Sequence, residues 1–122
     1  MKKAIIVVGK HFAGKSLTIG AHLTALLKIK RRARKFTLRG KRGFLRSQSF
    51  EESGLDVIAT IKKYFGYDLL VFAARPETEE GTKFKLIHNT LLKASFDVKK
   101  VEIKNQKEAP EKAAEIFKIL KS

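Results

Sequence analysis

Apolar positions along the chain recur with two periods, and each period predicts a different kind of element. Ala4–Val8 and Asp68–Ala74 are nearly continuous apolar runs, which is the pattern of strands covered on both faces of a sheet. Val98–Ile103 alternates apolar with charged residues and therefore predicts a half-exposed edge strand. Phe36–Leu38 and Phe44–Leu45 predict a β-hairpin, or a strand with an exposed loop, that carries basic side chains at its tip.

Four other segments show apolar residues at helical spacing. Ser16 to about Lys30 is apolar almost all round, so we expect a largely buried helix there. A second helix ends at Gly66 and has one apolar stripe, made of Leu55, Ile58, Ile61 and Phe65. Two more are expected over residues 82–95, with Phe84, Ile87 and Leu91 inward, and over residues 110–120, with Ala113, Phe117 and Leu120 inward.

A polar segment, Ser47–Gly54, separates the hairpin from the second helix and predicts a loop. Two pairs in and after this loop have the spacing of a capping box, in which a hydroxyl accepts a hydrogen bond from a backbone N–H three residues on. These pairs are Ser49 with Glu52 and Ser53 with Asp56. The sequence leaves open which of them caps a helix.

Strands that alternate with helices indicate a parallel α/β sheet. The chain has 122 residues, of which 43% are apolar, and this supports one domain with a real core over residues 1–122. We therefore expect an α/β, single-domain, three-layer sandwich with a mostly parallel sheet. Ligands of such sheets bind beyond the carboxyl ends of the strands.

The residues directly after the first predicted strand carry the most informative motif. Residues 9–16 read Gly-Lys-His-Phe-Ala-Gly-Lys-Ser and fit the pattern G-x-x-x-x-G-K-[ST] between a strand and a helix. Its glycines let the backbone turn tightly and approach an anion, and the N–H groups that open the next helix face that anion. The predicted binding residues are Gly9, Lys10, His11, Phe12, Ala13, Gly14, Lys15, Ser16 and Leu17.

At these residues the chain resembles the P-loop NTPases, through the Walker A motif that they share. The resemblance implies a P-loop NTPase-like fold that binds a nucleoside triphosphate with Mg²⁺, with ATP as the default and GTP as the alternative. It also implies that Lys15 bridges the β- and γ-phosphates, as a catalytic residue, and that the Ser16 hydroxyl is a ligand of Mg²⁺. The competing interpretation is a glycine turn that only joins a strand to a helix.

Phosphoryl transfer in this family usually needs a further carboxylate that holds Mg²⁺ through water, often at the end of an apolar strand. Here that strand ends at Arg75, and Asp68 lies at its beginning. Possible substitutes are Glu77, just past this strand, and Glu51, Glu52 and Asp56, in and after the loop 47–54; of these, Glu51 or Glu77 is preferred. The alternative role for Glu51 and Glu52 is to stabilise the N-terminus of a helix. This departure from the family pattern leaves hydrolysis open.

Arg75 itself is the second candidate catalytic residue. At the carboxyl end of the sheet its guanidinium is suited to stabilise charge on a transferring phosphoryl group, or to clamp a phosphate with two hydrogen bonds. The alternative is a solvent-exposed arginine before the turn at Pro76. His11 and His22 have no partner that the sequence identifies, so neither predicts acid–base or metal chemistry.

The net charge of +15 is unevenly distributed. Residues 1–50 hold 14 Lys or Arg and no acid, and ten of these basic residues fall within Lys28–Arg46. Such a segment attracts polyanions, so nucleic acid or another polyanion is the expected partner of Lys28–Arg46. A solvated basic face is the alternative, and no base-reading motif predicts sequence-specific recognition.

Three classes of function remain: a small Mg-nucleotide-dependent NTPase or kinase, a nucleotide-gated module that binds nucleic acid or protein with little turnover, and a scaffold that binds only phosphate. The chain has no cysteine, which excludes thiolate nucleophiles and cysteine-based zinc sites. No segment approaches the ~20 apolar residues of a transmembrane helix, and the apolar run after Lys3 is too short for a signal peptide. We therefore expect a soluble, cytoplasmic protein.

Overall fold

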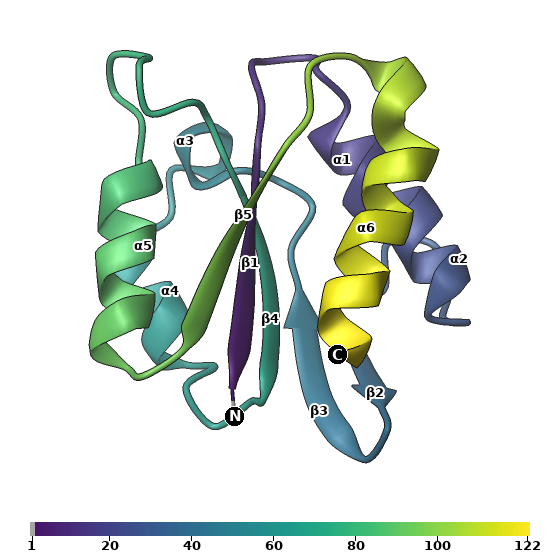
Figure 1. Cartoon of the computed structure of the whole chain (residues 1–122). Helices are drawn as coiled ribbons and strands as arrows, with labels where there is room; N and C mark the ends of the chain where they lie inside the picture. The colour runs from purple at the N-terminus through teal and green to yellow at the C-terminus, as the bar shows by residue number, and fades with distance from the viewer. Residues whose placement is uncertain (1) are drawn as a thin grey trace.

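Five strands form one sheet in the order β2-β3-β4-β1-β5 (Figure 1). The computed structural model describes residues 2–122, and in it β2 pairs with β3 antiparallel while every other neighbouring pair is parallel. The strands are β1 (Lys3–Val8), β2 (Lys35–Leu38), β3 (Lys41–Leu45), β4 (Leu69–Ala74) and β5 (Asp97–Glu102). The expected single α/β domain, its mostly parallel sheet and its edge strand β5 are confirmed.

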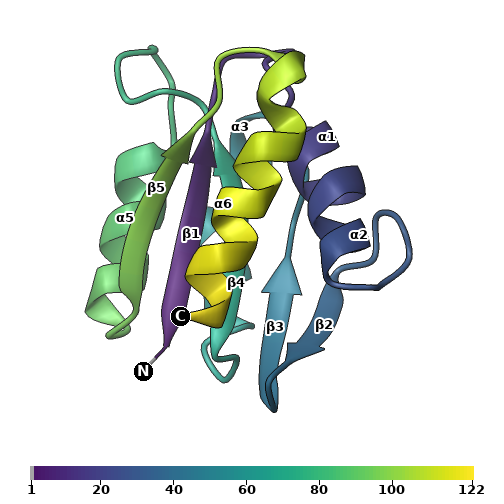
Figure 2. The ribbon, with the colours of Figure 1, turned by 45° about the vertical axis from the view of Figure 1, so that its right-hand side comes forward.

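Helices cover both faces of this sheet (Figures 1 and 2). One face carries α1 (Lys15–Leu17), η1 (Thr18–Leu23), α2 (Thr24–Leu26) and α6 (Ala109–Lys121), the last preceded by the short turn η2 (Gln106–Glu108). The other face carries α3 (Phe50–Ser53), α4 (Val57–Lys62) and α5 (Phe84–Lys93). Successive residues of β1 alternate between the two cores: Ile5 and Val7 pack toward α6, and Ala4 and Ile6 pack toward α5.

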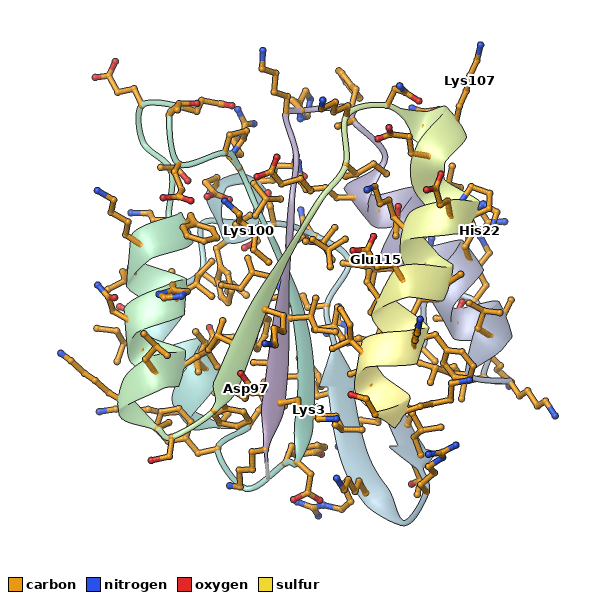
Figure 3. The ribbon with its side chains drawn as sticks, in the orientation of Figure 1. Lys3, His22, Asp97, Lys100, Lys107 and Glu115 are labelled. Carbon is orange, nitrogen blue, oxygen red and sulfur yellow. The ribbon has the colours of Figure 1, made fainter. Side chains whose placement is uncertain are left out.

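The first helix is continuous through α1, η1 and α2 but shorter than its apolar pattern predicts. It ends at Leu26 rather than near Lys30, because Lys28 adopts a left-handed φ of 59° and the amide of Ile29 turns back to the carbonyl of Thr24. Its central part, η1, is π-helical. His22 is half-buried and lies on this helix beside α6, at the right of Figure 3.

The predicted stripe of the second helix is wrong at two positions. Leu55 and Ile58 are each 42% exposed, and Val57 and Ile61 make the buried contacts. The reason is the cap: Asp56 Oδ1 accepts from the amide of Ala59 at 2.8 Å, so that α4 begins at Val57 and Leu55 precedes it.

The predicted polar loop 47–54 contains a helix, α3. Ser49 Oγ accepts from the amide of Glu52 at 3.3 Å, so of the two candidate caps in this segment Ser49 is the one that begins a helix. Phe50 packs in the core, and the two acids that follow it lie in the first turn of α3. This turn brings Glu51 and Glu52 to the carboxyl end of β4.

Two neighbouring strands send their connections to opposite faces at the carboxyl end of the sheet. The loop after β1 leads to α1 on one face, and the loop after β4 leads to α5 on the other. Such a divergence leaves a crevice between the two loops, which is where ligands of open α/β sheets bind. The glycine-rich segment Gly9–Ser16 directly follows β1 at this edge of the sheet.

Candidate nucleotide site

The loop Gly9–Ser16 is held against the chain that follows β5. A Cβ on Gly9 would lie 2.8 Å from the carbonyl oxygen of Ile103, and one on Gly14 would lie 3.0 Å from the Cα of Gln106. Gly14 also adopts φ 104°, which residues with a side chain rarely occupy. Both glycines therefore fix the loop by packing, in addition to any ligand that they approach.

The amide N–H groups at the end of this loop have no acceptor among the residues that the structure describes. Among residues 2–122, hydrogen bonds tie the amides of Gly9, Ala13 and Thr18 to carbonyl oxygens, but none is formed by the amides of Gly14, Lys15 or Ser16. Three adjacent N–H groups at the start of a helix make an anion-binding concavity. The long helix that follows contributes the positive end of its dipole.

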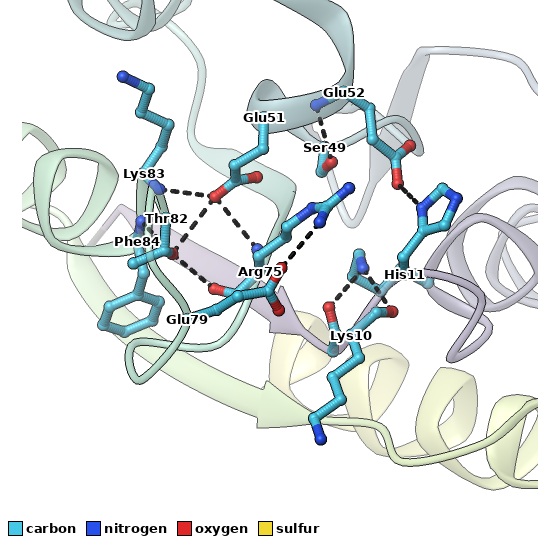
Figure 4. Close-up of polar contacts among 12 residues, drawn as sticks. Lys10, His11, Ser49, Glu51, Glu52, Arg75, Glu79, Thr82, Lys83 and Phe84 are labelled. Atoms are coloured by element: carbon cyan, nitrogen blue, oxygen red, sulfur yellow. Dashed lines mark hydrogen bonds and ion pairs between the residues drawn. The ribbon is translucent and has the colours of Figure 1, made fainter.

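Lys15 is buried at this concavity and folds back on its own loop. Its Nζ donates to the carbonyl oxygens of Gly9 and Lys10, the latter at 3.0 Å (Figure 4). Burial lowers the pKa of the Lys15 ammonium group, and the nearby guanidinium of Arg75 lowers it further, against the opposing effect of Glu52. The charged form of Lys15 is thus poorly compensated, and a polyanion would stabilise it.

A cavity of about 370 Å³ opens in front of these groups. Its wall includes six residues of the predicted binding segment, namely His11, Phe12, Gly14, Lys15, Ser16 and Leu17. Gly9 and Lys10 face a different cavity, and Ala13 is buried in the core. The wall is completed by residues that the motif does not contain: Gly20, Ala21, Arg31, Arg32, Ser47, Glu52 and Gln106.

Glu52 is the acid that shares this cavity with Ser16. Its Oε1 lies 2.9 Å from Nδ1 of His11, so the two side chains meet across the cavity (Figure 4). The sequence included Glu52 among the possible acids but favoured Glu51 or Glu77. Successive residues of one helical turn point about 100° apart, so Glu51 and Glu52 face different surroundings, which a sequence pattern cannot assign.

Glu51 is occupied in a structural network. Its Oε2 accepts from the backbone amides of Lys83 at 2.6 Å and Arg75 at 3.2 Å, and Thr82 Oγ1 lies 3.4 Å away (Figure 4). These bonds join α3 to the loop between β4 and α5. The second oxygen, Oε1, is buried with no hydrogen-bond partner among the described residues.

Arg75, the predicted catalytic arginine, is paired rather than free. Its Nη1 donates to Glu79 Oε1 at 2.7 Å, and this hydrogen bond raises the pKa of Arg75 above its ordinary value. Its Nε is buried and lacks a partner. Arg75 does not line the cavity of Lys15, although its charge acts on Lys15.

Glu77, the other predicted metal-binding acid, lies on a separate groove. Together with Lys10 and Lys100 it lines a cavity of about 610 Å³ beside the end of β5. Its Oε1 accepts from Lys100 Nζ at 3.1 Å, and Figure 3 shows Lys100 on the upper half of the sheet. Asp68 lies at the opposite end of β4, as expected, and its Oδ2 accepts from the amide of Arg42 at 3.3 Å.

Comparison with known proteins gives no relative: no family model, no curated protein and no solved structure matches the chain. Within residues 2–122, no helix has the length and apolar character needed to cross a membrane. The site must therefore be interpreted from its own geometry.

Proposed function

We propose that the protein is a P-loop NTPase-like protein that binds a nucleoside triphosphate, ATP or alternatively GTP, in the cavity at the Gly9–Ser16 loop. The observation that carries this proposal is the set of donors at the cavity: the amides of Gly14, Lys15 and Ser16 without acceptors, and the buried ammonium of Lys15. A triphosphate would supply the missing acceptors and compensate the buried charge. The ammonium would move from the loop carbonyls to the phosphates.

The residues present also fit Mg²⁺. The exposed hydroxyl of Ser16 and the carboxylate of Glu52 are oxygen donors on one cavity, and Mg²⁺ in phosphate sites takes one or two protein oxygens together with phosphates and waters. In that arrangement the Ser16 hydroxyl would be a ligand of Mg²⁺. The Glu52 carboxylate would leave His11 and hold a water molecule bound to the metal. The metal would neutralise charge on the β- and γ-phosphates.

A second candidate function is nucleotide binding with little or no turnover. It is favoured by the state of the two side chains suited to catalysis after β4: Arg75 is paired with Glu79, and Glu51 accepts from two backbone amides. Phosphoryl transfer would require Arg75 to leave Glu79. Turnover of bound nucleotide, measured by phosphate release, distinguishes the two functions.

The test is calorimetric titration of ATP and GTP, each with and without Mg²⁺, into the wild type and Lys15→Ala. We expect Mg²⁺-dependent binding that weakens at least ~100-fold in the variant, because a charged donor to phosphate is lost. Lys10→Ala is the matched control, since it removes an exposed lysine of the same loop that does not line the cavity. Equal affinity of wild type and Lys15→Ala, with both folded by circular dichroism, would reject the proposal.

A further inference from the structure

A second, smaller hollow adjoins the cavity of Lys15. It has a volume of about 140 Å³ and is lined by Arg32, Ala33, Arg34, Leu45, Arg46, Ser47 and Gln48. Arg32 and Ser47 line both spaces, so the two are neighbours with a common wall. At about 30 Å³ for each water molecule, the hollow has room for a phosphate group, but drug-sized ligands need roughly 300 Å³ or more.

The arginines of this hollow have no anionic partner in the described part of the chain. Within residues 2–122, no carboxylate forms an ion pair with Arg32, Arg34 or Arg46, and Arg46 Nε is buried without an acceptor. Burial lowers the pKa of Arg46, and the like charge of Arg34 lowers it further. A buried guanidinium N–H without an acceptor is costly, and a bound anion would remove that cost.

The backbone holds the arginines in this arrangement. The segment after α2 folds back on the first helix, where the amide of Arg32 donates to the carbonyl of Gly20 at 2.8 Å, and the amide of Leu45 donates to Arg34 at 2.7 Å. Arg32 adopts a φ of 66°, a strained conformation for a residue with a side chain. Gly20 lies against this segment, since a Cβ built on it would be in van der Waals contact with Ser47 at 3.5 Å and with Arg32 at 3.7 Å.

We propose that Arg32, Arg34 and Arg46 form a second anion site, which binds the phosphate group of a small phosphomonoester next to the nucleotide. Guanidinium groups suit this role because their N–H groups match two phosphate oxygens at once. The inference rests on the proposed function for the identity of the neighbouring ligand. It names the second substrate or effector class: a phosphorylated small molecule anchored within reach of the triphosphate.

The basic residues of Lys28–Arg46 do not form one continuous surface, because β3 separates those at the hairpin from Arg46. This separation favours a small ligand over a nucleic acid. Arg42 and Arg46 are at opposite ends of β3, roughly 13 Å apart at 3.3 Å per residue. At the hairpin end the cations already have partners: Arg39 Nη1 donates to the carbonyl of Lys121, and Arg42 stacks 4.5 Å from the ring centre of Tyr67. Among the described residues, the end near the cavity of Lys15 is the one where arginines of this segment line a hollow.

The experiment follows the Arg46 Nε–H resonance by NMR while glycerol 3-phosphate is added at constant ionic strength. We expect a saturable shift of this resonance in the wild type and also in Lys15→Ala, which keeps the arginine hollow. The affinity of each variant is measured by calorimetry, because Arg46→Gln removes the observed resonance. It should fall about tenfold or more in Arg34→Gln/Arg46→Gln, since charged hydrogen bonds to the phosphate are lost. It should be nearly unchanged in Arg39→Gln/Arg42→Gln, which removes the same charge at the other end of β3.

The outcomes separate this site from the proposed nucleotide site. Binding of glycerol 3-phosphate without any binding of ATP or GTP would support the arginine site and reject the nucleotide. An Arg46 resonance that does not move, or equal weakening in the two double variants, would overturn the arginine site. Tighter binding of a ten-residue oligothymidylate than of glycerol 3-phosphate, weakened equally by both double variants, would also overturn it and assign the basic residues to nucleic acid. The single variant Arg34→Gln replaces the double variant if the latter does not fold.

Discussion

The two loops at the carboxyl ends of β1 and β4 face each other and use their polar groups in opposite ways. The loop Gly9–Ser16 leaves amide donors without acceptors and buries a lysine beside them. In the loop over residues 75–83 these donors are paired: Glu51 accepts from the backbone amides of Arg75 and Lys83, and Glu79 accepts from the guanidinium of Arg75. The first loop therefore has donors that an anion could satisfy. In the second loop the amides of Arg75 and Lys83 and one guanidinium N–H group are paired, and Arg75 Nε and Glu51 Oε1 are the buried atoms without a partner among the described residues.

This difference bears on catalysis as well as on binding. A guanidinium that is paired with a carboxylate contributes to a reaction only if the pair opens, as Arg75 would have to do by leaving Glu79. Among the described residues, Glu52 is the one acid that lines the cavity of Lys15, and it comes from α3, where Ser49 caps the helix. If the cavity binds Mg-nucleotide as proposed, this acid would take the place of the one that the family pattern puts after β4.

The largest effect that would test this difference between the two loops is the loss of stability expected in Glu51→Gln. Loss of the charge that accepts from the amides of Arg75 and Lys83 should lower the free energy of unfolding by roughly 2 kcal/mol, measured by urea denaturation. The affinity for Mg-nucleotide should change little. Glu77→Gln, which breaks a surface pair with Lys100, is the control and should cost less than about 1 kcal/mol.

The opposite result would break the comparison. If Glu51→Gln leaves stability unchanged and removes Mg²⁺-dependent binding, then Glu51 is the metal-holding acid that the sequence favoured. The loop over residues 75–83 would then take part in ligand binding rather than only in the stability of the fold.

A smaller effect concerns the pH dependence of stability and involves Lys15. Because burial lowers its pKa in the folded state below that in the unfolded chain, the folded state loses this proton first as pH rises. Between pH 7 and pH 10 the unfolding free energy of the wild type should therefore rise relative to that of Lys15→Met. The rise should be about 1.4 kcal/mol for each unit by which folding lowers the pKa of Lys15. The measurement is thermal or urea unfolding without nucleotide at each pH, with Lys10→Met as control. A difference independent of pH would contradict a poorly compensated Lys15 charge.

The parts of the fold that the sequence predicted are those determined locally. Apolar runs located β1 and β4, and the glycine and lysine spacing located the loop between β1 and α1, because each of these patterns lies within about ten consecutive residues. The apolar stripe of α4 was misplaced because Leu55, although apolar, lies before the Asp56 cap. A cap decides where a helix begins, and here the cap is Asp56, which the sequence pattern had placed in the first turn of a helix capped by Ser53.

The remaining features of the site depend on contacts between distant segments. Arg34 and Arg46 meet only because the hairpin brings residues twelve apart together, and Glu51 finds its donors at Arg75 and Lys83. A run of ten basic residues indicated an anionic partner, but it did not indicate that β3 separates them into two groups. The Ser49 cap is the one local signal that could have favoured Glu52, since it fixes which residues form the first turn of α3.

The smallest predicted effect tests whether the pair between Arg75 and Glu79 keeps Arg75 away from a bound ligand. Glu79→Gln weakens the partner of Arg75 without touching the Gly9–Ser16 loop, so the guanidinium becomes free to approach a bound triphosphate. Because a surface pair is worth 1 kcal/mol or less, we expect Mg-nucleotide affinity to rise only about threefold, measured by calorimetry. Glu80→Gln changes the net charge equally at the next, exposed position and should leave the affinity unchanged. Equal gains in both variants would reduce the effect to net charge, whereas a faster release of phosphate in Glu79→Gln alone would show that Arg75, once free, takes part in turnover.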